Sequence, residues 1–513
     1  MPYELCYSIA CTVFAAVYFC TNCIYIYILF QMALKIFLFG VLLFTSYSDA
    51  LRLLVFFPMH AKSHSILGHG VVDNLLAAGH EVNGDLTIRK IAQAKLDPIV
   101  LMGFMCEVHR QVIEHPGVLE LFENPKHKFD GVILEWFYSK FVAGIAPLFG
   151  APLIWVVSTE AHWQVLELID GPSNPAYNVD LFSTNSLPLN LFQRTEELYT
   201  MVKVYIQSSY YIIPKEKNIY ESTLTSIARK RGVTLPTFEE AVYNASLMLI
   251  TSHPSIGTPY KLPQNAKLVA GYHISTEVKP LPQDLKKLMD NAKYGVVYFS
   301  MGSHLKSSDM SEQMKSGLLK MFAKLDETVI WKVEDDLEIV PKNVHLVKWA
   351  PQQSILAHPN LKFFITHGGQ LSTTEAIHFG VPVIGIPIMG DQYVNMNSVS
   401  NKGFGITVKW SEDSIISDLT AAIKEIKTNP MYTTKAKEIS QIYHNRQVTP
   451  GKDLVYWVEY VIATGGALHL RSPGLSLPLY KKLYLDLLAL IIIVVYFVTK
   501  KLRPIISKKL NFV

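Results

Sequence analysis

Cysteine is scarce in this sequence of 513 residues, which contains 5 cysteines. Cys6, Cys11, Cys20 and Cys23 all fall within the first two dozen residues, so Cys106 stands alone in the rest of the chain. Neither a disulfide framework nor a cysteine-based metal site can be built in that remainder. The sequence also lacks an Asp-x-Asp triplet, a feature that would have pointed to a bound divalent cation.

Charge is low as well. Charged residues make up 18% of the chain and the formal net charge is +4, without any long basic run interleaved with aromatic residues. A nucleic-acid partner is therefore not expected. Hydrophobic residues make up 50%, which is enough to form large cores in two or more domains.

Both ends of the chain are apolar. The sequence from Met32 to Ala50 has one lysine, an apolar core and a small-x-small ending, the pattern of a cleavable secretory signal, and translation is expected to start at Met32. Residues 1–31 are read as an upstream extension, with an N-terminal anchor as the alternative. Residues 1–50 are thus an extension plus signal peptide.

Residues 483–499 are predicted to form a transmembrane helix, which would be ~26 Å long. Lysines precede it, and the more basic tail of residues 500–513 marks that side as cytosolic. The prediction is a single-pass type I protein of the endoplasmic reticulum membrane with a lumenal body. Asn244 lies in an Asn-Ala-Ser sequon, a glycosylation signal that agrees with this location.

Between the two ends, strand-like apolar runs alternate with amphipathic segments of helix length, which indicates α/β architecture with parallel sheets. Strands are expected at 51–57, 131–134, 152–157, 296–301, 329–333, 344–348, 362–366 and 383–386, and a helix at 65–78. Pro280 and Pro282 lie between the halves, so the domains are predicted as 51–275 and 291–465. A ligand cleft would lie between them.

The stretch FFITHGGQLSTTEAIHFGVP at 363–382 carries the strongest signal. Ser372 and Glu375 read as a capping box that opens a helix after a buried strand, but that interpretation leaves His367 unexplained. Extended to WAPQQ at 349–353 and GDQ at 390–392, the stretch resembles the signature of the UDP-glycosyltransferase family, and the chain looks most like insect-type membrane-bound members. VVYFSMGS at 296–303 and FDGVILEW at 129–136 add to the resemblance.

The resemblance implies a GT-B fold, in which two Rossmann-like doubly wound domains face each other. The second domain would bind a UDP-sugar, a co-substrate rather than a resident cofactor, and the first a small lipophilic acceptor. Hexose transfer in detoxification is the implied function, with glucose favoured by Gln392; a homo-oligomer is left open. The donor residues implied are Ser303, Trp349, Gln352, His367, Gly369, Ser372, Thr373, Glu375, Asp391 and Gln392. Leu371 departs from the asparagine of many relatives, which removes one polar contact near the phosphates.

On the acceptor side, the family match selects His64 as the catalytic base and Glu135 as the carboxylate that orients it. A neutral histidine suits proton abstraction near pH 7, and a carboxylate stabilises the imidazolium that forms. A solvent-facing role for Glu135 is the alternative, with Asp130 as the fallback partner. No metal is expected, since His367 and helix-end amides would stabilise the departing diphosphate.

One part of the match fails. Val82 is followed by a turn signal at residues 83–85, and the segment up to Phe129 is shorter than in relatives, so the acceptor domain is expected to have lost an interior strand near residues 83–89. The alternative function is therefore a membrane-anchored protein that binds UDP-sugar or lipophiles with little or no transfer. A nicotinamide-dependent oxidoreductase is discounted, because no G-x-G-x-x-G follows a first strand.

Overall fold

The structure is a computed structural model that describes residues 50–59, 61–83, 97–302, 310–335, 337 and 339–510, with side chains described up to residue 501. The chain divides into two compact units, Met1–Leu51 and Arg52–Val513. The predicted signal segment, residues 32–50, belongs to the first unit and, except for Ala50, lies outside the described residues, as do Ser303 and residues 84–96. All that follows concerns the second unit.

Six parallel strands form the sheet of the first domain, in the order β2-β1-β3-β4-β5-β6. Leu53 of β1 aligns with Gly131 of β3, and every residue of β3 is buried. A parallel sheet covered on both faces favours such continuous apolar strands. The strands are β1 (Arg52–Phe56), β2 (Glu81–Asn83), β3 (Gly131–Trp136), β4 (Leu153–Val157), β5 (Leu247–Ile250) and β6 (Ala266–Leu268).

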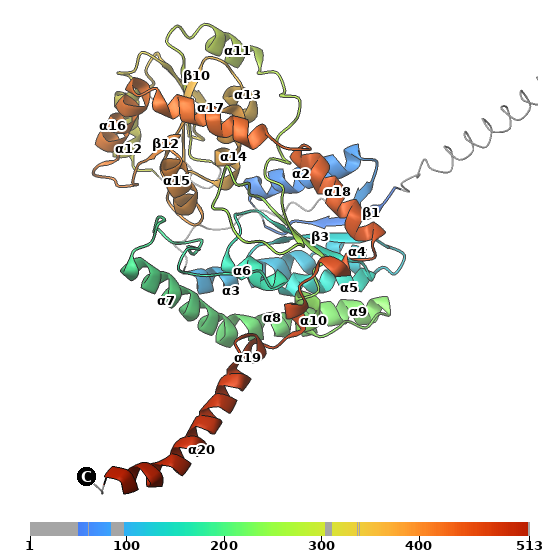
Figure 1. Ribbon diagram of the computed structural model, residues 1–513. Coiled ribbons are helices and arrows are strands. Elements are labelled where there is room, and N and C mark those ends of the chain that lie inside the picture. The colour runs from blue at the N-terminus through green and yellow to red at the C-terminus, as the bar shows by residue number, and fades with distance from the viewer. Residues whose placement is uncertain are drawn as a thin grey trace, which may run out of the picture. The chain divides into compact units, whose positions relative to one another are not determined.

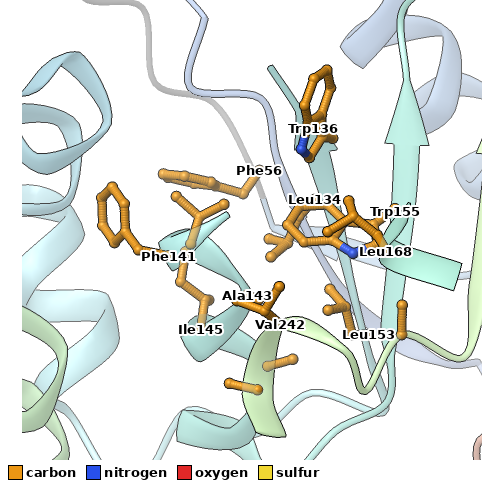
Figure 2. Close-up of a cluster of buried hydrophobic side chains, with 14 of the residues drawn as sticks. Phe56, Leu134, Trp136, Phe141, Ala143, Ile145, Leu153, Trp155, Leu168 and Val242 are labelled. Carbon is orange, nitrogen blue, oxygen red and sulfur yellow. The ribbon is translucent and has the colours of Figure 1, made fainter. Parts of the chain in front are cut away.

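Helices cover this sheet and close its core. Figure 2 shows part of that core, where Phe56, Leu134, Phe141 and Trp155 gather around β3. Two π-helical turns, Ser208–Ile212 and Tyr220–Leu224, join α7, α8 and α9. The helices are α2 (Lys62–Ala77), α3 (Pro98–Ile113), α4 (Pro116–Glu123), α5 (Ile145–Phe149), α6 (Trp163–Leu166), α7 (Leu191–Gln207), α8 (Ile213–Ile219), α9 (Thr225–Arg231) and α10 (Phe238–Val242).

The second domain repeats the plan with a parallel sheet in the order β12-β11-β10-β7-β8-β9. Its strands are β7 (Val296–Ser300), β8 (Thr328–Lys332), β9 (Val344–Val347), β10 (Leu361–Thr366), β11 (Val383–Gly385) and β12 (Gly405–Thr407). Its helices are α11 (Gln283–Asp290), α12 (Glu312–Phe322), α13 (Gln352–Leu356), α14 (Gln370–Phe379), α15 (Gln392–Asn401), α16 (Ile415–Thr428) and α17 (Met431–His444).

Each sheet has a point where the strand order reverses. In the first sheet the chain runs outward from β1 to β2 and then crosses to β3; in the second it runs from β7 to β9 and then crosses to β10. Ligands of open parallel sheets bind beyond the carboxyl ends of the strands at such a point. The ends of β1, β3, β7 and β10 are therefore the places where site residues are expected.

The chain returns to the first domain after α17. Helix α18 (Pro450–Ala463) packs against α2, beside which it lies in Figure 1. His80 Nε2 and Glu459 Oε1 are 3.1 Å apart across this contact. The predicted second domain, 291–465, thus includes a helix that packs on the first, because apolar residues of α18 such as Ile462 cover Gly131 at the start of β3.

The expected loss of a strand near residues 83–89 falls almost wholly outside the described residues, so it stays a prediction. Strand β2 is present with three residues, and among the described residues it is the edge strand, paired only with β1. The shortened segment thus follows an edge strand. Since β1 keeps β2 on one side and β3 on the other, Leu53 and Leu54 stay buried.

The C-terminal segment forms the short helix α19 (Leu479–Lys482) and then α20 (Leu485–Leu510). The large apolar side chains of α20 from Leu485 to Val498 are exposed. In the part of the chain that the structure describes, no helix combines the length and the apolar character that crossing a membrane requires. The predicted transmembrane segment therefore has no confirmation in the structure.

Candidate active site

The predicted base and its carboxylate meet at the reversal point of the first sheet. Helix α2 begins at Lys62, three residues earlier than expected, which puts His64 in its first turn after β1. Glu135 is in β3, the neighbouring strand, and is fully buried. His64 Nδ1 and Glu135 Oε1 are hydrogen-bonded. The solvent-facing alternative for Glu135 is therefore wrong.

The surroundings of the pair fix how it is oriented. The ring of Phe137 meets that of His64 edge-on, with 4.5 Å between centroids. With Nδ1 held by the carboxylate, Nε2 is the imidazole nitrogen available to take a proton. The fallback Asp130 lies at the opposite end of β3, where it accepts a hydrogen bond of 2.7 Å from the backbone N–H of Arg52.

A glycine-lined turn follows β10 at the reversal point of the second sheet. His367 comes directly after the strand, Gly368 has φ +81°, and Gly369 is the N-cap of α14. Gly302, at φ +73° beyond β7, lies against the same imidazole. A Cβ at Gly302 or Gly369 would overlap the His367 ring, so glycine is required at both positions.

The predicted capping box is wrong. Because the glycine turn already starts α14 at Gln370, Ser372 is the third helical residue and no side chain caps the helix. The Ser372 hydroxyl instead accepts from Gln352 Nε2 at 3.1 Å. Thr373 donates its hydroxyl to the carbonyl of Gly369 at 3.0 Å.

Glu375 is the centre of a buried polar network. Gln352 Nε2 donates to its Oε2 at 2.6 Å, Gln353 Nε2 donates to its Oε1 at 3.0 Å, and His273 Nε2 lies 3.6 Å from Oε1. Burial alone would raise the pKa of Glu375, but His273 and the two amides bring that pKa below its usual value. Glu375 therefore stays ionised and is a strong acceptor.

Asp391 and Gln392 begin α15 and shape the turn before it. Gln392 Oε1 accepts from the backbone N–H groups of Ile388 and Met389 at 2.8 and 3.1 Å. Asn395 Nδ2 donates to Asp391 Oδ2 at 2.9 Å and to the Gly368 carbonyl at 3.0 Å. Burial raises the pKa of Asp391, and the Asn395 bond and the nearby His64 oppose that rise. Asp391, in the second domain, thus interacts electrostatically with His64 in the first.

Comparisons with known proteins identify this arrangement. The family model described as "UDP-glucoronosyl and UDP-glucosyl transferase" matches residues 101–512. The chain belongs to the UDP-glycosyltransferase family. UDP-glucosyltransferase 2 of Dactylopius coccus is 31% identical over 491 residues, covering 89% of this chain and 92% of that protein. UDP-glucuronosyltransferase 2B15 of Rattus norvegicus is 30% identical, covering 68% of this chain and 64% of that one.

Solved structures confirm the GT-B fold. The calicheamicin glycosyltransferase CalG4 has a TM-score of 0.54 at 16% identity, covering 81% of this chain and 99% of that one. The spinosyn forosaminyltransferase SpnP has a TM-score of 0.53 at 19% identity, covering 81% of this chain and all of that one. At such identities the likeness shows the fold alone. Family membership shows that the chain is a glycosyltransferase that uses a UDP-sugar as co-substrate.

Several residues around the site of this UDP-glycosyltransferase have no signal in the sequence. His109 of α3 is fully buried, and both of its ring nitrogens lack a hydrogen-bond partner among the described residues. Burial, helped by His64, lowers the pKa of His109 to about 3, so this ring is neutral. Gln353, His273 and Asn395 were also missed; Gln353, directly after Gln352, was the one that its position could have suggested.

The two domains of the enzyme also touch through polar groups beside the site. Gln370 Nε2 donates to the Thr251 carbonyl at 2.8 Å, and Lys402 Nζ donates to the carbonyls of Ile256 and Gly257 at 3.0 and 2.9 Å. Trp349, half-exposed on the loop before α13, faces the cleft residue Lys62. These contacts hold the N-terminal end of α14 and the C-terminal end of α15 against the first domain.

Two further features lie outside the His64–Glu135 pair and the network around Glu375. A cavity of about 30 Å³ in the first domain is lined by aromatic and charged side chains and excludes both His64 and Glu135; its lining includes Trp136, Tyr138, Trp163, Tyr205, Lys140 and Glu216. Asn244 is exposed, and its side-chain oxygen accepts from Arg471 at 2.7 Å. Among the described residues no group of three or more His, Cys, Asp or Glu side chains could hold a metal ion.

Proposed function

We propose that this chain transfers a hexose, with glucose favoured, from a UDP-sugar to a hydroxyl of a small lipophilic acceptor with inversion at the anomeric carbon. The observation that carries the proposal is the hydrogen bond between His64 and Glu135 at the reversal point of the first sheet. A buried carboxylate that fixes Nδ1 leaves Nε2 as a base.

The proposed reaction is a single displacement. His64 Nε2 takes the proton of the acceptor hydroxyl while the acceptor oxygen bonds to the anomeric carbon. The bond from that carbon to the β-phosphate oxygen breaks, UDP leaves with both electrons of that bond, and Glu135 stabilises the imidazolium. His367 and the N-terminal amides of α14 meet the negative charge that develops on the diphosphate.

The donor is assigned to the turn and network of the second domain. Trp349 is the platform for uracil, Glu375 accepts from the ribose hydroxyls, and Asp391 and Gln392 hold the sugar. The amide of Gln352 donates hydrogen bonds to Glu375 and Ser372. In addition to contacting the nucleoside, Gln352 would therefore orient Glu375 toward the ribose hydroxyls. Support for glucose comes from the name of the relative UDP-glucosyltransferase 2.

We also propose that the enzyme works at the endoplasmic reticulum membrane in the detoxification of lipophiles. The support is the exposed apolar run of α20, with Lys481 and Lys482 before it and a larger basic group after it: Lys500, Lys501, Arg503, Lys508 and Lys509. A basic group that follows an apolar segment favours the cytosolic side. Glycosylation of Asn244 would report a lumenal body directly.

A second candidate is a protein that binds the donor but transfers little. The short edge strand β2 favours it, since the segment that follows is abbreviated on the acceptor side. Both candidates are tested by incubating the membrane-bound enzyme with UDP-glucose or UDP-glucuronate and a panel of phenols. UDP release with a β-linked product supports the transferase, whereas UDP-glucose binding without release supports the binding protein.

A further inference from the structure

Lys62 covers the ring on which the donor base is assigned to stack. Its ammonium nitrogen lies 3.1 Å from the centroid of the Trp349 ring. Lys62 belongs to the first domain and Trp349 to the second, so this cation–π contact joins the two halves at the donor platform. Trp349 is 52% exposed, which leaves the ring accessible to a ligand once the lysine moves.

Apart from the ring, Lys62 interacts only through charge with its described neighbours. Among the described residues it has no hydrogen bond or ion pair, and its side chain is exposed. A second ammonium, that of Lys332, lies 6.0 Å from the same ring; it donates to the Gly302 carbonyl at 2.8 Å and pairs with Glu334. Burial and Lys332 lower the pKa of Lys62, and Glu334 opposes them. The lysine is therefore held by the ring contact and by the negative charge of Glu334, against the like charge of Lys332.

We propose that Lys62 and the nucleobase of the donor compete for the face of Trp349, which makes Lys62 a residue of the donor site contributed by the acceptor domain. The inference rests on the proposed function, because it takes Trp349 as the uracil platform. One face of an indole ring holds either an ammonium or a stacked base at van der Waals distance, not both.

The competition also concerns the catalytic helix. Lys62 is the first residue of α2 and His64 is the third, so the ring contact ties the first turn of α2 to the donor domain. When the nucleobase stacks on Trp349, the first turn of α2 loses its contact with the second domain but keeps the hydrogen bond between His64 and Glu135. Lys62 is thus a positioning residue, since it acts on donor affinity without touching the reacting atoms.

The test is calorimetric titration with UDP of the wild type, Lys62→Gln and Lys62→Arg. An exposed cation–π contact corresponds to about a two- to fivefold change in affinity. Lys62→Gln should tighten the Kd for UDP by that factor and lower the KM for UDP-sugar equally with kcat unchanged. Lys62→Arg keeps a cation over the ring and should bind UDP as the wild type does.

The chain offers a matched control in Lys267, whose ammonium lies 3.7 Å from the ring of Trp457, away from the donor residues. Lys267→Gln should leave the Kd for UDP unchanged. An unchanged or weaker Kd for Lys62→Gln would overturn the inference. Trp349→Ala distinguishes a failure of the proposed uracil platform from a failure of the competition. If this variant binds UDP like the wild type, the platform itself is wrong. If it binds UDP more weakly while Lys62→Gln does not bind it more tightly, only the competition is wrong.

Discussion

The two domains differ in how their buried polar groups are partnered beside the site. In the second domain Glu375, Gln352, Ser372, Asp391 and Asn395 bond to one another or to backbone groups. In the first, more buried polar atoms lack a partner among the described residues; they include atoms of Glu135, Trp136, Ser158, His162 and Gln164, whereas the second domain has such atoms on Gln370, His378 and Arg446. A buried polar atom without a partner destabilises a fold unless a ligand or water completes it.

The difference separates two kinds of task. A donor that is always a UDP-sugar can be met by a fixed, satisfied network, which needs little rearrangement. Acceptors of varied shape are better met by polar atoms that are still free to bond. Changes in the first domain should therefore mainly alter kcat, and its buried polar groups without partners should make stability depend on pH. Changes in the second domain should mainly alter the Kd for UDP.

The sharpest test of the acceptor half is Glu135→Gln. The amide keeps the shape but cannot stabilise an imidazolium, so kcat should fall by about 10²- to 10⁴-fold while the Kd for UDP stays within twofold. Glu135→Asp, which keeps the charge but is shorter, should retain more activity than Glu135→Gln. A Glu135→Gln enzyme with wild-type kcat would remove the carboxylate from the mechanism.

The donor half is tested by Gln352→Ala. This change removes the donor to Glu375 Oε2, so the Kd for UDP should weaken by about tenfold, with a much smaller change in kcat. Gln441→Ala on the exposed face of α17 is the control and should change neither quantity. A large loss of kcat at unchanged Kd would contradict the division of tasks.

A buried histidine without hydrogen-bond partners in the first domain predicts that the protein becomes less stable at acidic pH. His162 is buried without partners, and burial lowers its pKa to about 3. As pH falls below about 6.5, His162 takes up a proton in the unfolded chain but not in the folded one, so the free energy of unfolding decreases. His162→Leu should therefore gain about 1–2 kcal/mol relative to wild type between pH 7.5 and 5.0. Thermal unfolding at both pH values measures this; a pH-independent difference would contradict it.

The interdomain carboxylate Glu160 predicts a smaller effect of opposite sign. Burial raises its pKa to about 7, opposed by Lys402 and by the Thr258 N–H, which lies 3.3 Å from Oε2. This contribution is fully present below about pH 4.5 and is lost as pH rises through 7. Glu160→Gln should thus gain about 1 kcal/mol on wild type between pH 6 and pH 7. Equal Tm shifts at both pH values would be evidence against it.

Local patterns in the sequence were sufficient for eight of the twelve strands that the structure describes; β2, β5, β6 and β12 were not expected. The expected strands fall within a few residues of those observed, because apolar runs of parallel strands are read locally. The family match selected His64 and Glu135, and they meet because α2 begins shortly after β1, the strand that pairs with β3, which carries Glu135.

Long-range packing and turn geometry could not be predicted from the sequence. The return of α18 to α2 depends on tertiary contacts, as does the bonding of Gln353 and His273 around Glu375. Ser372 satisfies the capping-box spacing, but the left-handed backbone of Gly368 starts the helix earlier. Nor does the sequence show that β2 is the edge strand among the described residues.

The central claim is that chemistry belongs to the first domain and donor affinity to the second. His64→Ala, assayed for transfer from UDP-glucose and for UDP binding by calorimetry, tests it most directly. The account predicts that kcat falls by at least about 10³-fold while the Kd for UDP stays within twofold of wild type. Wild-type turnover in this variant, or loss of UDP binding together with activity, would contradict the account.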